Sequence, residues 1–274
     1  KIVHSQPLNF FMSDKPEWMT EEAVITLYRG YLMKDETPNQ MYYRLAKTAA
    51  SYYPNGLGDI TEKDLFEMFH FALLKGWLSP ASPVAANLGA GTKSQTVSCQ
   101  GLYVDNSIGG IFDSVREAAL LTKAGAGLGI NLTGIEGMTS PSQWSKFFDL
   151  VGSVISQGSR RGAVSIYIDI DQKGAMEFLN SKDLLQGDVR EKLDCNIAVI
   201  INDSFMERLK AKESKALALF SKVMELRLKF GSPYIQFIDS CHRQDHEFFK
   251  KLGMKTGSSQ LCSEIHLFHD KDHT

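Results

Sequence analysis

The sequence predicts a helical domain over residues 1–78, followed by an α/β domain over residues 79–274. In the first part, apolar residues recur every three or four positions, which is the period of a helix with one buried face. After the Ser-Pro-Ala-Ser-Pro stretch at 79–83, short runs rich in β-branched residues alternate with helical stretches. This second pattern is typical of βα units.

Three helices are expected in the first domain. Their ranges are Glu21 to Met33, Asn39 to Tyr53 and Glu62 to Trp77. Thr20 and Thr61 are each followed by acidic residues, which is an N-cap signal. The Tyr-Pro-Asn-Gly sequence at 53–56 predicts a turn after the second helix. We expect the aromatic residues of these helices to form the core of a helical bundle.

Strands and helices are expected to alternate in the second domain. The expected strands are 97–104, 127–131, 163–170, 195–201, 234–238 and 260–267, and the expected helices are 111–122, 143–156, 205–210 and 215–229. Strands separated by helices place the chemistry of such a domain at strand ends and in loops.

Composition places the chain among globular proteins, with 43% hydrophobic and 23% charged residues. The 30 Lys and Arg against 32 Asp and Glu give a formal net charge of −2. This balance offers no electrostatic attraction to nucleic acid or an anionic membrane. No apolar run reaches the ~18 residues of a spanning helix, and no apolar core of a signal peptide follows Lys1. We therefore expect a cytoplasmic protein with neither nucleic acid nor membrane as partner.

The four cysteines, at 99, 195, 241 and 262, are too few and too scattered for a secreted disulfide framework. Cys241-His242 with His246 lacks a second pair of ligands at zinc spacing. We therefore expect no bound metal and mostly buried thiols.

Two glycine-containing loops could contact a ligand. Gly125, Gly127 and Gly129 would let the backbone approach a ligand, or would form a structural turn. Arg160 and Arg161 on a Gly/Ser loop suit an anionic or planar ligand, or belong to a solvated loop.

Two predicted strands carry cysteines. Ser98-Cys99 lies on the strand at 97–104. On the strand at 260–267, alternation would place Gln260, Cys262 and Glu264 on one face. A thiol between an amide and a carboxylate indicates a redox or radical site, and ordinary burial is the alternative.

Taken together, these segments resemble the large, catalytic subunit of ribonucleotide reductase, most closely that of class I enzymes and their phage relatives. The motifs, in chain order, are Ser-Pro-x-Ser-Pro, Ser-Cys, Gly-x-Gly-x-Gly-x-Asn, Gln-Gly-Ser-Arg-Arg-Gly-Ala and Leu-Cys-Ser-Glu-Ile. The similarity runs from about Pro80 to Leu267. It implies that residues 79–274 form the first part of a ten-stranded α/β barrel preceded by the helical domain.

The resemblance implies roles for four residues in the chemistry. Cys262 would become a thiyl radical that abstracts the 3′-hydrogen of the substrate ribose, and Glu264 would act as general base on the 3′-hydroxyl. Cys99 would be one of two thiols that reduce the intermediate and end as a disulfide. Gln260 stands where class I enzymes usually have Asn, and its amide would contact the 2′-hydroxyl.

The resemblance also implies binding residues. Ser82, Ser98 and Gly127 would contact the ribonucleotide substrate, and Arg161 would sense its base.

Regulation would involve a second set of residues. Asn106, Ser107, Ile108 and Gln157 would bind an ATP or dNTP effector. The helices at 111–122 and 143–156 would pair two subunits into a homodimer. Glu136 stands where some relatives have an arginine for the effector phosphate. We expect no overall dATP on/off site in residues 1–274, because they contain no ATP-cone before the helical region.

The family's barrel continues well past the Cys262 strand, so we expect this chain to be one half of a split reductase or a truncated form. A C-terminal partner chain would complete it. Further partners would be a small metal-containing subunit that supplies the radical and thioredoxin or glutaredoxin as reductant. No cofactor would be bound by this chain itself. For a phage enzyme the compartment would be the host cytoplasm.

Two alternatives stay open at this point. One is a regulatory nucleotide-binding and dimerisation subunit that performs no chemistry. The other is a fragment of a cobalamin-dependent (class II) reductase, although the active-site strand of that class usually reads Asn-Pro-Cys-Gly-Glu, which is absent here.

Overall fold

The computed structural model describes residues 3–91, 95–135, 140–157, 160–183, 192–268 and 270, with the backbone alone for 156, 157, 160 and 161. The chain forms two compact units. The first comprises residues 1–98 and 157–160, and the second comprises residues 99–156 and 161–274. In the part that the structure describes, no helix is long and apolar enough to cross a membrane.

The first unit is helical, as predicted. Its helices are α1 (Leu8–Ser13), α2 (Glu21–Gly30), α3 (Pro38–Ser51), α4 (Glu62–Leu74) and α5 (Ser82–Asn87). Thr20, Thr37 and Thr61 are the N-caps of α2, α3 and α4, and each side chain accepts a backbone N–H of the first turn. The three helices expected from the apolar spacing are therefore confirmed.

The contacts divide the chain after Ser98, whereas the change in sequence pattern falls near residue 78. The difference arises at α5, because Ala85 belongs to the apolar core of the helical unit. Arg44 of α3 also donates to the carbonyl oxygen of Ala85 at 3.0 Å. The composition of the chain therefore changes at the Ser-Pro segment, but the first unit continues beyond it to Ser98.

The second unit contains a five-stranded parallel sheet in the order β1-β2-β5-β6-β7. The strands are β1 (Cys99–Leu102), β2 (Gly127–Asn131), β5 (Val164–Asp169), β6 (Asn196–Ile201) and β7 (Tyr234–Phe237). Five of the six predicted strands are confirmed. The short strands β3 (Ser156–Gln157) and β4 (Arg160–Arg161) pair in the arginine loop.

Helices connect the parallel strands, as crossover connections require. They are α6 (Ile108–Ala124), α7 (Pro141–Val154), α8 (Ala175–Asn180), α9 (Asp203–Lys210) and α10 (Ser214–Phe230). Two shorter helices, α11 (Ile238–Gln244) and α12 (Glu247–Lys251), follow β7. Gly125, with φ of +112°, adopts the left-handed conformation that ends α6 before β2.

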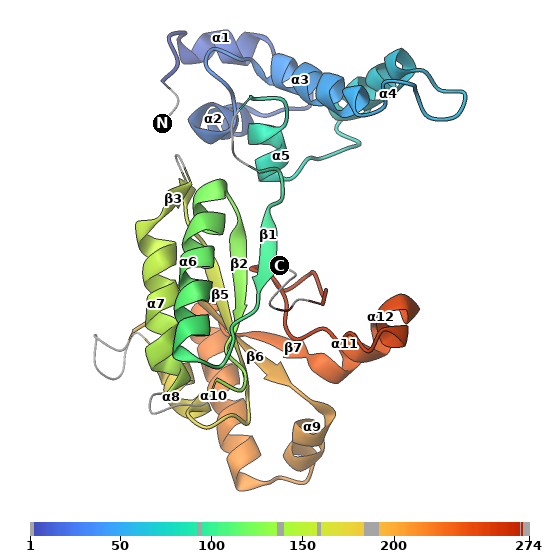
Figure 1. Ribbon diagram of the computed structural model, residues 1–274. Coiled ribbons are helices and arrows are strands. Elements are labelled where there is room, and N and C mark those ends of the chain that lie inside the picture. The colour runs from blue at the N-terminus through green and yellow to red at the C-terminus, as the bar shows by residue number, and fades with distance from the viewer. Residues whose placement is uncertain are drawn as a thin grey trace. The chain divides into compact units, whose positions relative to one another are not determined.

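The two faces of the sheet differ in composition. On one face, fully buried residues such as Leu128, Ile130 and Ile166 pack with α6, α7 and α10 (Figure 1). The alternate residues form what we term the loop-side face. On β1, β2 and β5 they are Cys99, Gly101, Gly127, Gly129, Asn131, Ser165, Tyr167 and Asp169. Most side chains on this part of the face are small or polar. Residues 257–263 lie against them.

The predicted strand at 260–267 is wrong. Residues 256–268 contain turns and irregular backbone. The carbonyl oxygens of Gln260 and Leu261 accept hydrogen bonds from side chains of β5 instead of from a neighbouring strand. The residues have a strand-like composition, but no partner strand is present beside them in the part of the chain that is described.

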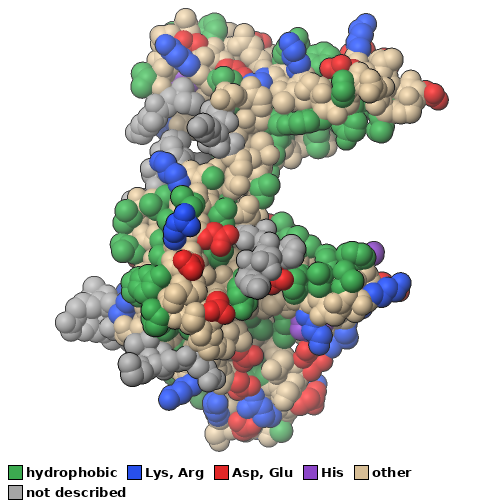
Figure 2. Space-filling model, viewed as in Figure 1, with side chains coloured by type: hydrophobic (Ala, Val, Ile, Leu, Met, Phe, Trp, Pro, Cys, Tyr) green, Lys and Arg blue, Asp and Glu red, His purple; other side chains and the backbone are tan. Residues whose placement is uncertain are grey.

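Helices α6 and α7 expose apolar side chains on the surface that faces away from the sheet. The exposed residues are Ile108, Phe112, Leu120, Phe147, Leu150 and Val154. Figure 2 shows hydrophobic side chains gathered over α7. The Phe112 and Phe147 rings meet edge to face at 5.3 Å, so the two helices contribute to one apolar surface.

Candidate active site

The Cys262 loop, residues 256–265, lies against the loop-side face. Its first anchor is Asn131 at the end of β2, whose side-chain amide donates to the carbonyl oxygen of Gly257 at 3.1 Å. At the start of the loop, the carbonyl oxygen of Thr256 lies 2.8 Å from the His242 ring of α11. The loop is thus held from β2 and from α11 before it reaches the cysteine.

Two glycines of β2 let the loop approach the sheet. A Cβ atom on Gly129 would overlap the carbonyl oxygen of Ser259 and lie 2.6 Å from the Cα of Gln260. A Cβ atom on Gly127 would overlap the side chain of Leu261. Gly129 therefore lets the loop backbone pack against the strand backbone, and Gly127 makes room for the Leu261 side chain.

Strand β5 supplies the next two anchors. The Ser165 hydroxyl donates to the carbonyl oxygen of Leu261 at 2.6 Å. The Tyr167 hydroxyl lies 2.7 Å from the carbonyl oxygen of Gln260 and 2.5 Å from the Ser263 hydroxyl. Since Ser165 and Tyr167 are two residues apart on a strand, both point to the same face. Together they hold the residues on both sides of Cys262.

Cys262 occupies a tight turn. The Ser263 N–H lies 3.4 Å from the carbonyl oxygen of Gln260, and Ser263 has φ of +68°, a left-handed conformation that is uncommon outside glycine. The side-chain oxygen of Gln260 accepts from the Ile265 N–H at 2.9 Å. This bond closes the turn across its base.

The residues of this turn differ in their exposure to solvent. Gln260 is 4% exposed, whereas the Cys262 and Glu264 side chains are exposed. The Gln260 side-chain nitrogen is buried and has no hydrogen-bond partner among the described residues. Such a buried donor is costly unless a partner is supplied. The turn therefore presents a thiol and a carboxylate to solvent, with an unsatisfied amide beneath them.

Strand register brings Cys99 to the same face as the loop. Cys99 is the partner of Gly127 across the β1–β2 pair, and a Cβ atom on Gly127 would overlap the side chain of Leu261, the neighbour of Cys262. Paired residues of a parallel ladder direct their side chains to one face of the sheet. Two cysteines distant in sequence thus lie on the same side of one sheet.

The electrostatics of the site centre on Tyr167. Burial raises the pKa of the Tyr167 phenol to about 12, although its hydrogen bonds to Ser263 and Ser259 act in the opposite direction. Tyr167 therefore stays protonated throughout the physiological pH range and can act as a hydrogen-bond donor.

Family comparisons decide the class of protein. The all-alpha domain of ribonucleotide reductase matches residues 18–93, and its barrel domain matches residues 97–218. The chain belongs to the ribonucleotide reductase large-subunit family. Cys262 lies after the span that the barrel-domain model matches.

Relatives of this chain include viral proteins. A Frog virus 3 protein assigned as a ribonucleoside-diphosphate reductase large subunit is 30% identical over 83% of this chain and 42% of its own length. The large subunit of Acanthamoeba polyphaga mimivirus is 26% identical over 90% of this chain and 33% of its own length. The chain thus spans less than half the length of both relatives.

A solved structure is also similar. The class Id ribonucleotide reductase alpha subunit of Actinobacillus ureae aligns with a TM-score of 0.79 and 25% identity, over 94% of this chain and 48% of that chain. The helical unit and the parallel sheet are therefore those of a reductase alpha subunit, with part of the barrel present.

The four residues of this chain that are predicted to bind substrate lie in different parts of the molecule. Gly127 is on the loop-side face against Leu261. Ser82 and Ser98 belong to the first unit, where the Ser82 hydroxyl lies 3.2 Å from the Tyr31 hydroxyl. The Arg161 side chain lies outside what the structure describes, and Arg161 itself is in β4.

The predicted effector residues of the reductase gather at the start of α6. Ser107 is the N-cap, and its hydroxyl accepts from the Gly110 N–H at 3.0 Å. Asn106 and Ile108 beside it are exposed. The Gln157 side chain and all of Glu136 lie outside the described residues.

Sequence reasoning missed the residues that hold the Cys262 loop. Tyr167, Ser165, Asn131 and Ser259 were not among the expected site residues. The alternation within Val-Ser-Ile-Tyr-Ile-Asp at 164–169 does place Ser165 and Tyr167 on the face opposite the apolar core. Two hydroxyl side chains on the face opposite the core were therefore the feature of the sequence that could have indicated a hydrogen-bonding role for these residues.

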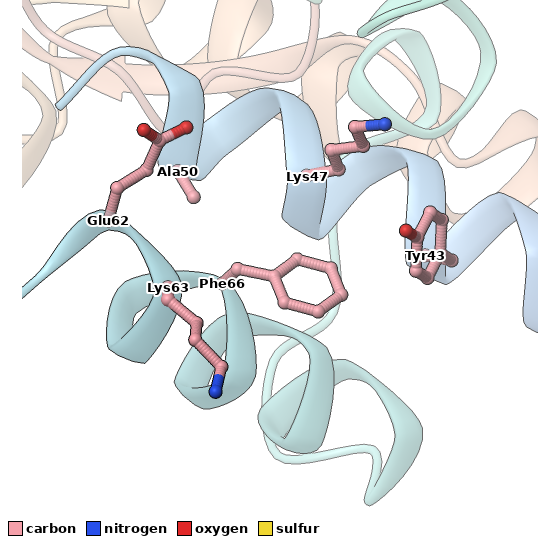
Figure 3. A pocket seen from close by; sticks show the side chains of 6 residues that line it. All are labelled: Tyr43, Lys47, Ala50, Glu62, Lys63 and Phe66. Atoms are coloured by element: carbon pink, nitrogen blue, oxygen red, sulfur yellow. The ribbon is translucent and has the colours of Figure 1, made fainter. Parts of the chain in front are cut away.

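A separate cavity lies in the helical unit, between α3 and α4. Its volume is about 310 Å³. The lining side chains are Tyr43, Lys47, Ala50, Glu62, Lys63 and Phe66 (Figure 3). The Tyr43 and Phe66 rings meet edge to face at 5.2 Å. This cavity contains none of the residues that the reductase resemblance singled out.

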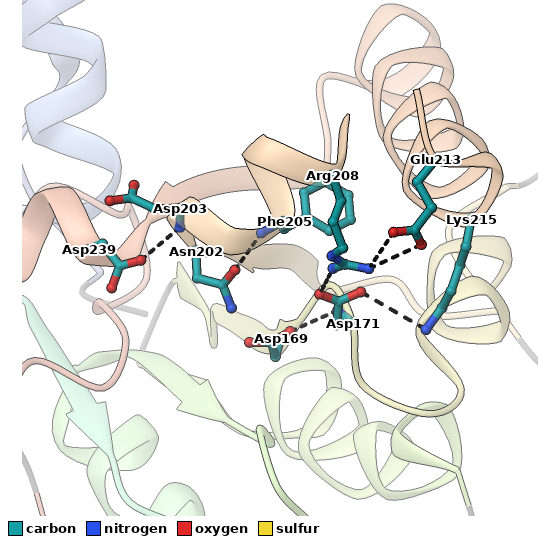
Figure 4. A network of polar contacts seen from close by, with 9 residues as sticks. All are labelled: Asp169, Asp171, Asn202, Asp203, Phe205, Arg208, Glu213, Lys215 and Asp239. Carbon is teal, nitrogen blue, oxygen red and sulfur yellow. Dashed lines mark hydrogen bonds and ion pairs between the residues drawn. The ribbon is translucent and has the colours of Figure 1, made fainter. Parts of the chain in front are cut away.

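A polar network connects the segment that follows β5 with α9 and with the start of α10. Arg208 of α9 contacts Asp171, which follows β5, and lies 3.2 Å from Glu213 at the start of α10 (Figure 4). Burial raises the pKa of the nearby Asp169 carboxyl. Because these groups pair with one another, we assign the network to the stability of the sheet.

Proposed function

We propose that this chain carries the thiol chemistry of a ribonucleotide reductase catalytic subunit, which converts ribonucleotides to deoxyribonucleotides. The observation that carries the proposal is the placement of two cysteines, Cys99 and Cys262, on one face of the parallel sheet. Family membership supplies the reaction class, and the exposed thiol beside an exposed carboxylate suits a substrate sugar.

In the proposed reaction, Cys262 first receives its radical from a small metal-containing subunit. The Cys262 sulfur then takes the hydrogen atom from C3′ of the ribose, which leaves a carbon radical and a restored thiol. Glu264 accepts the proton of the 3′-hydroxyl and transfers it to the 2′-hydroxyl, which leaves as water. The unpartnered nitrogen of Gln260 would donate to a hydroxyl of the substrate.

Reduction of the intermediate consumes two thiols. Cys99 provides one electron and one proton. A second cysteine provides the second electron and the second proton, and the two sulfurs end as a disulfide. Cys262 finally returns its hydrogen atom to C3′ and is a thiyl radical again. The second cysteine is expected in the part of the catalytic subunit that this chain does not span. Thioredoxin or glutaredoxin would reduce the disulfide.

We also propose that α6 and α7 pair two catalytic subunits. Their exposed apolar surface includes Phe112, Phe147 and Leu150. Apolar patches of this kind mark interaction surfaces, and the effector residues at the start of α6 are next to it. Effector binding at Ser107 would therefore act close to the subunit interface.

The remainder of the barrel is needed for turnover. An incomplete barrel leaves β7 with an unpaired edge and the loop-side face partly uncovered. The missing part comes from the same polypeptide or, as the sequence predicts, from a C-terminal partner chain. Tests of activity therefore use the complete catalytic subunit together with its radical-generating small subunit.

The deciding experiment is Cys262→Ser in that complete enzyme. We expect deoxyribonucleotide formation to fall by at least about a thousandfold, which corresponds to ~4 kcal/mol of barrier. Nucleotide binding, measured by equilibrium dialysis, stays unchanged because Ser keeps the shape of the turn. Ready multiple turnover by the variant would refute the proposal. Turnover that requires added adenosylcobalamin would assign the chain to the cobalamin-dependent class.

A further inference from the structure

The Tyr167 phenol is placed between the two ends of the Cys262 turn. Its side chain is fully buried, and its hydroxyl contacts the Gln260 carbonyl oxygen at 2.7 Å and the Ser263 hydroxyl at 2.5 Å. These partners lie two residues before and one residue after Cys262. A single rigid group on β5 therefore connects both ends of the turn.

The direction of both hydrogen bonds follows from chemistry. A carbonyl oxygen can only accept, so the Tyr167 hydroxyl donates its one proton to Gln260. The Ser263 hydroxyl must then donate to the Tyr167 oxygen. The elevated pKa of Tyr167, about 12, keeps this donor protonated. Substitution by Phe would leave the Gln260 carbonyl and the Ser263 hydroxyl without this partner.

The turn needs such support because its backbone is strained. Ser263 adopts φ of +68°, and a residue other than glycine in this region costs about 1 kcal/mol or more unless surrounding contacts hold it. Ser165 holds the Leu261 carbonyl from the same strand. The thiol position thus depends on side chains of β5 that do not touch the substrate.

We propose that Tyr167 is a positioning residue, which fixes the Cys262 sulfur at the distance and angle required for hydrogen abstraction. This inference rests on the proposed radical role of Cys262. Hydrogen transfer is sensitive to displacements well below 1 Å, so a loosened turn slows the chemical step while the substrate site stays intact.

The test compares Tyr167→Phe with Tyr234→Phe in the complete reductase. Tyr234 lies on β7 and packs against the same cluster of Tyr167, Ala198 and Ile200, but it has no hydrogen bond to the loop among the described residues. For Tyr167→Phe we expect kcat to fall about tenfold with KM within about twofold. The Tyr234→Phe enzyme should match the wild type in both constants.

An isotope effect separates positioning from general loss of folded enzyme. With a substrate deuterated at C3′, the isotope effect on kcat should rise in Tyr167→Phe because abstraction has become slower. A smaller active fraction would lower kcat and leave the isotope effect unchanged, and that result would overturn the proposal. A kcat within twofold of wild type would also overturn it.

Ser263→Ala provides a second test. It removes the other member of the pair, so the double variant Tyr167→Phe/Ser263→Ala should be no slower than Tyr167→Phe alone. Fully additive losses would contradict a shared contact. If Cys262→Ser retains turnover, the proposed function itself fails. If Cys262→Ser is inactive and Tyr167→Phe is normal, the positioning role alone fails.

Discussion

A Cβ atom on Gly129 would overlap the carbonyl oxygen of Ser259, so β2 and the Cys262 loop are in direct backbone contact at this glycine. Gly129 does not have a positive φ, and an alanine would therefore strain the contact rather than its own backbone. The loop can sit on the sheet because β2 lacks side chains there.

Gly129→Ala should displace the loop and lower turnover of the complete reductase by at least about tenfold. The control is Gly109→Ala, because a Cβ atom at Gly109 in α6 meets no atom within 4 Å. That substitution should leave turnover unchanged and raise stability by about 0.4–1 kcal/mol, because alanine lowers the conformational entropy of the unfolded chain. Steady-state assays and thermal unfolding measure both effects. Normal turnover by Gly129→Ala would contradict the backbone contact.

Cys99→Ser should behave differently from Cys262→Ser. The radical can still form on Cys262 and abstract hydrogen, but no disulfide with Cys99 can form. We expect the enzyme to inactivate during reaction with substrate and to release free base from the nucleotide. Liquid chromatography of the reaction mixture distinguishes free base from deoxyribonucleotide. Sustained clean reduction would remove Cys99 from the mechanism.

Leu150→Glu should weaken pairing of catalytic subunits. Leu150 is 59% exposed on α7, so a charge is tolerated in the monomer but is costly inside an apolar interface. Leu228 on α10 is 86% exposed and lies outside the α6–α7 surface, so Leu228→Glu is the control. Analytical ultracentrifugation should show a shift towards monomer for Leu150→Glu alone. Unchanged dimerisation of Leu150→Glu would mean that another surface pairs the subunits.

Tyr167 should titrate later than an unfolded tyrosine. Its pKa is about 12 in the folded protein because of burial, against ~10 in an unfolded chain. Above pH 10 the unfolded state loses a proton that the folded state keeps, so the contribution of Tyr167 to stability is present below pH 10 and declines between pH 10 and 12. At pH 11 the loss is about 1.4 kcal/mol.

Absorbance at 295 nm measures this directly. Wild type and Tyr167→Phe should show the same phenolate absorbance up to pH 11 when folded. In guanidinium chloride they should differ by about half a phenolate at pH 10, because the unfolded tyrosine has a pKa of ~10. A difference of that size at pH 10 in the folded proteins would contradict the burial of Tyr167.

Two capping threonines of the helical unit should differ in importance. The Thr37 side chain is buried, caps α3 and also donates to Asp14 at 2.5 Å. Thr61 caps α4 and is exposed. We expect Thr37→Ala to lower the free energy of unfolding by about 2 kcal/mol and Thr61→Ala by about 0.5–1 kcal/mol. Thermal unfolding of the complete subunit would reveal the order, and equal losses would contradict it.

Local sequence determined the secondary structure of this protein to a large extent. Helices α2, α3 and α4 follow from apolar spacing, with threonine caps before α2 and α4. Strands β5 and β6 follow from runs of apolar and β-branched residues. Both signals act within a few residues of the chain, so they are readable without the fold. The motif resemblance likewise depended on local stretches of sequence.

Tertiary structure decided how the candidate site is assembled. The segment at 260–267 resembles a strand in composition, but side chains of β5 take the hydrogen bonds of Gln260 and Leu261 and turn the chain at Cys262. The register of β1 with β2 sets the place of Cys99 on the same face. Contacts between residues so far apart in sequence form only when the sheet is assembled, and no local pattern encodes them.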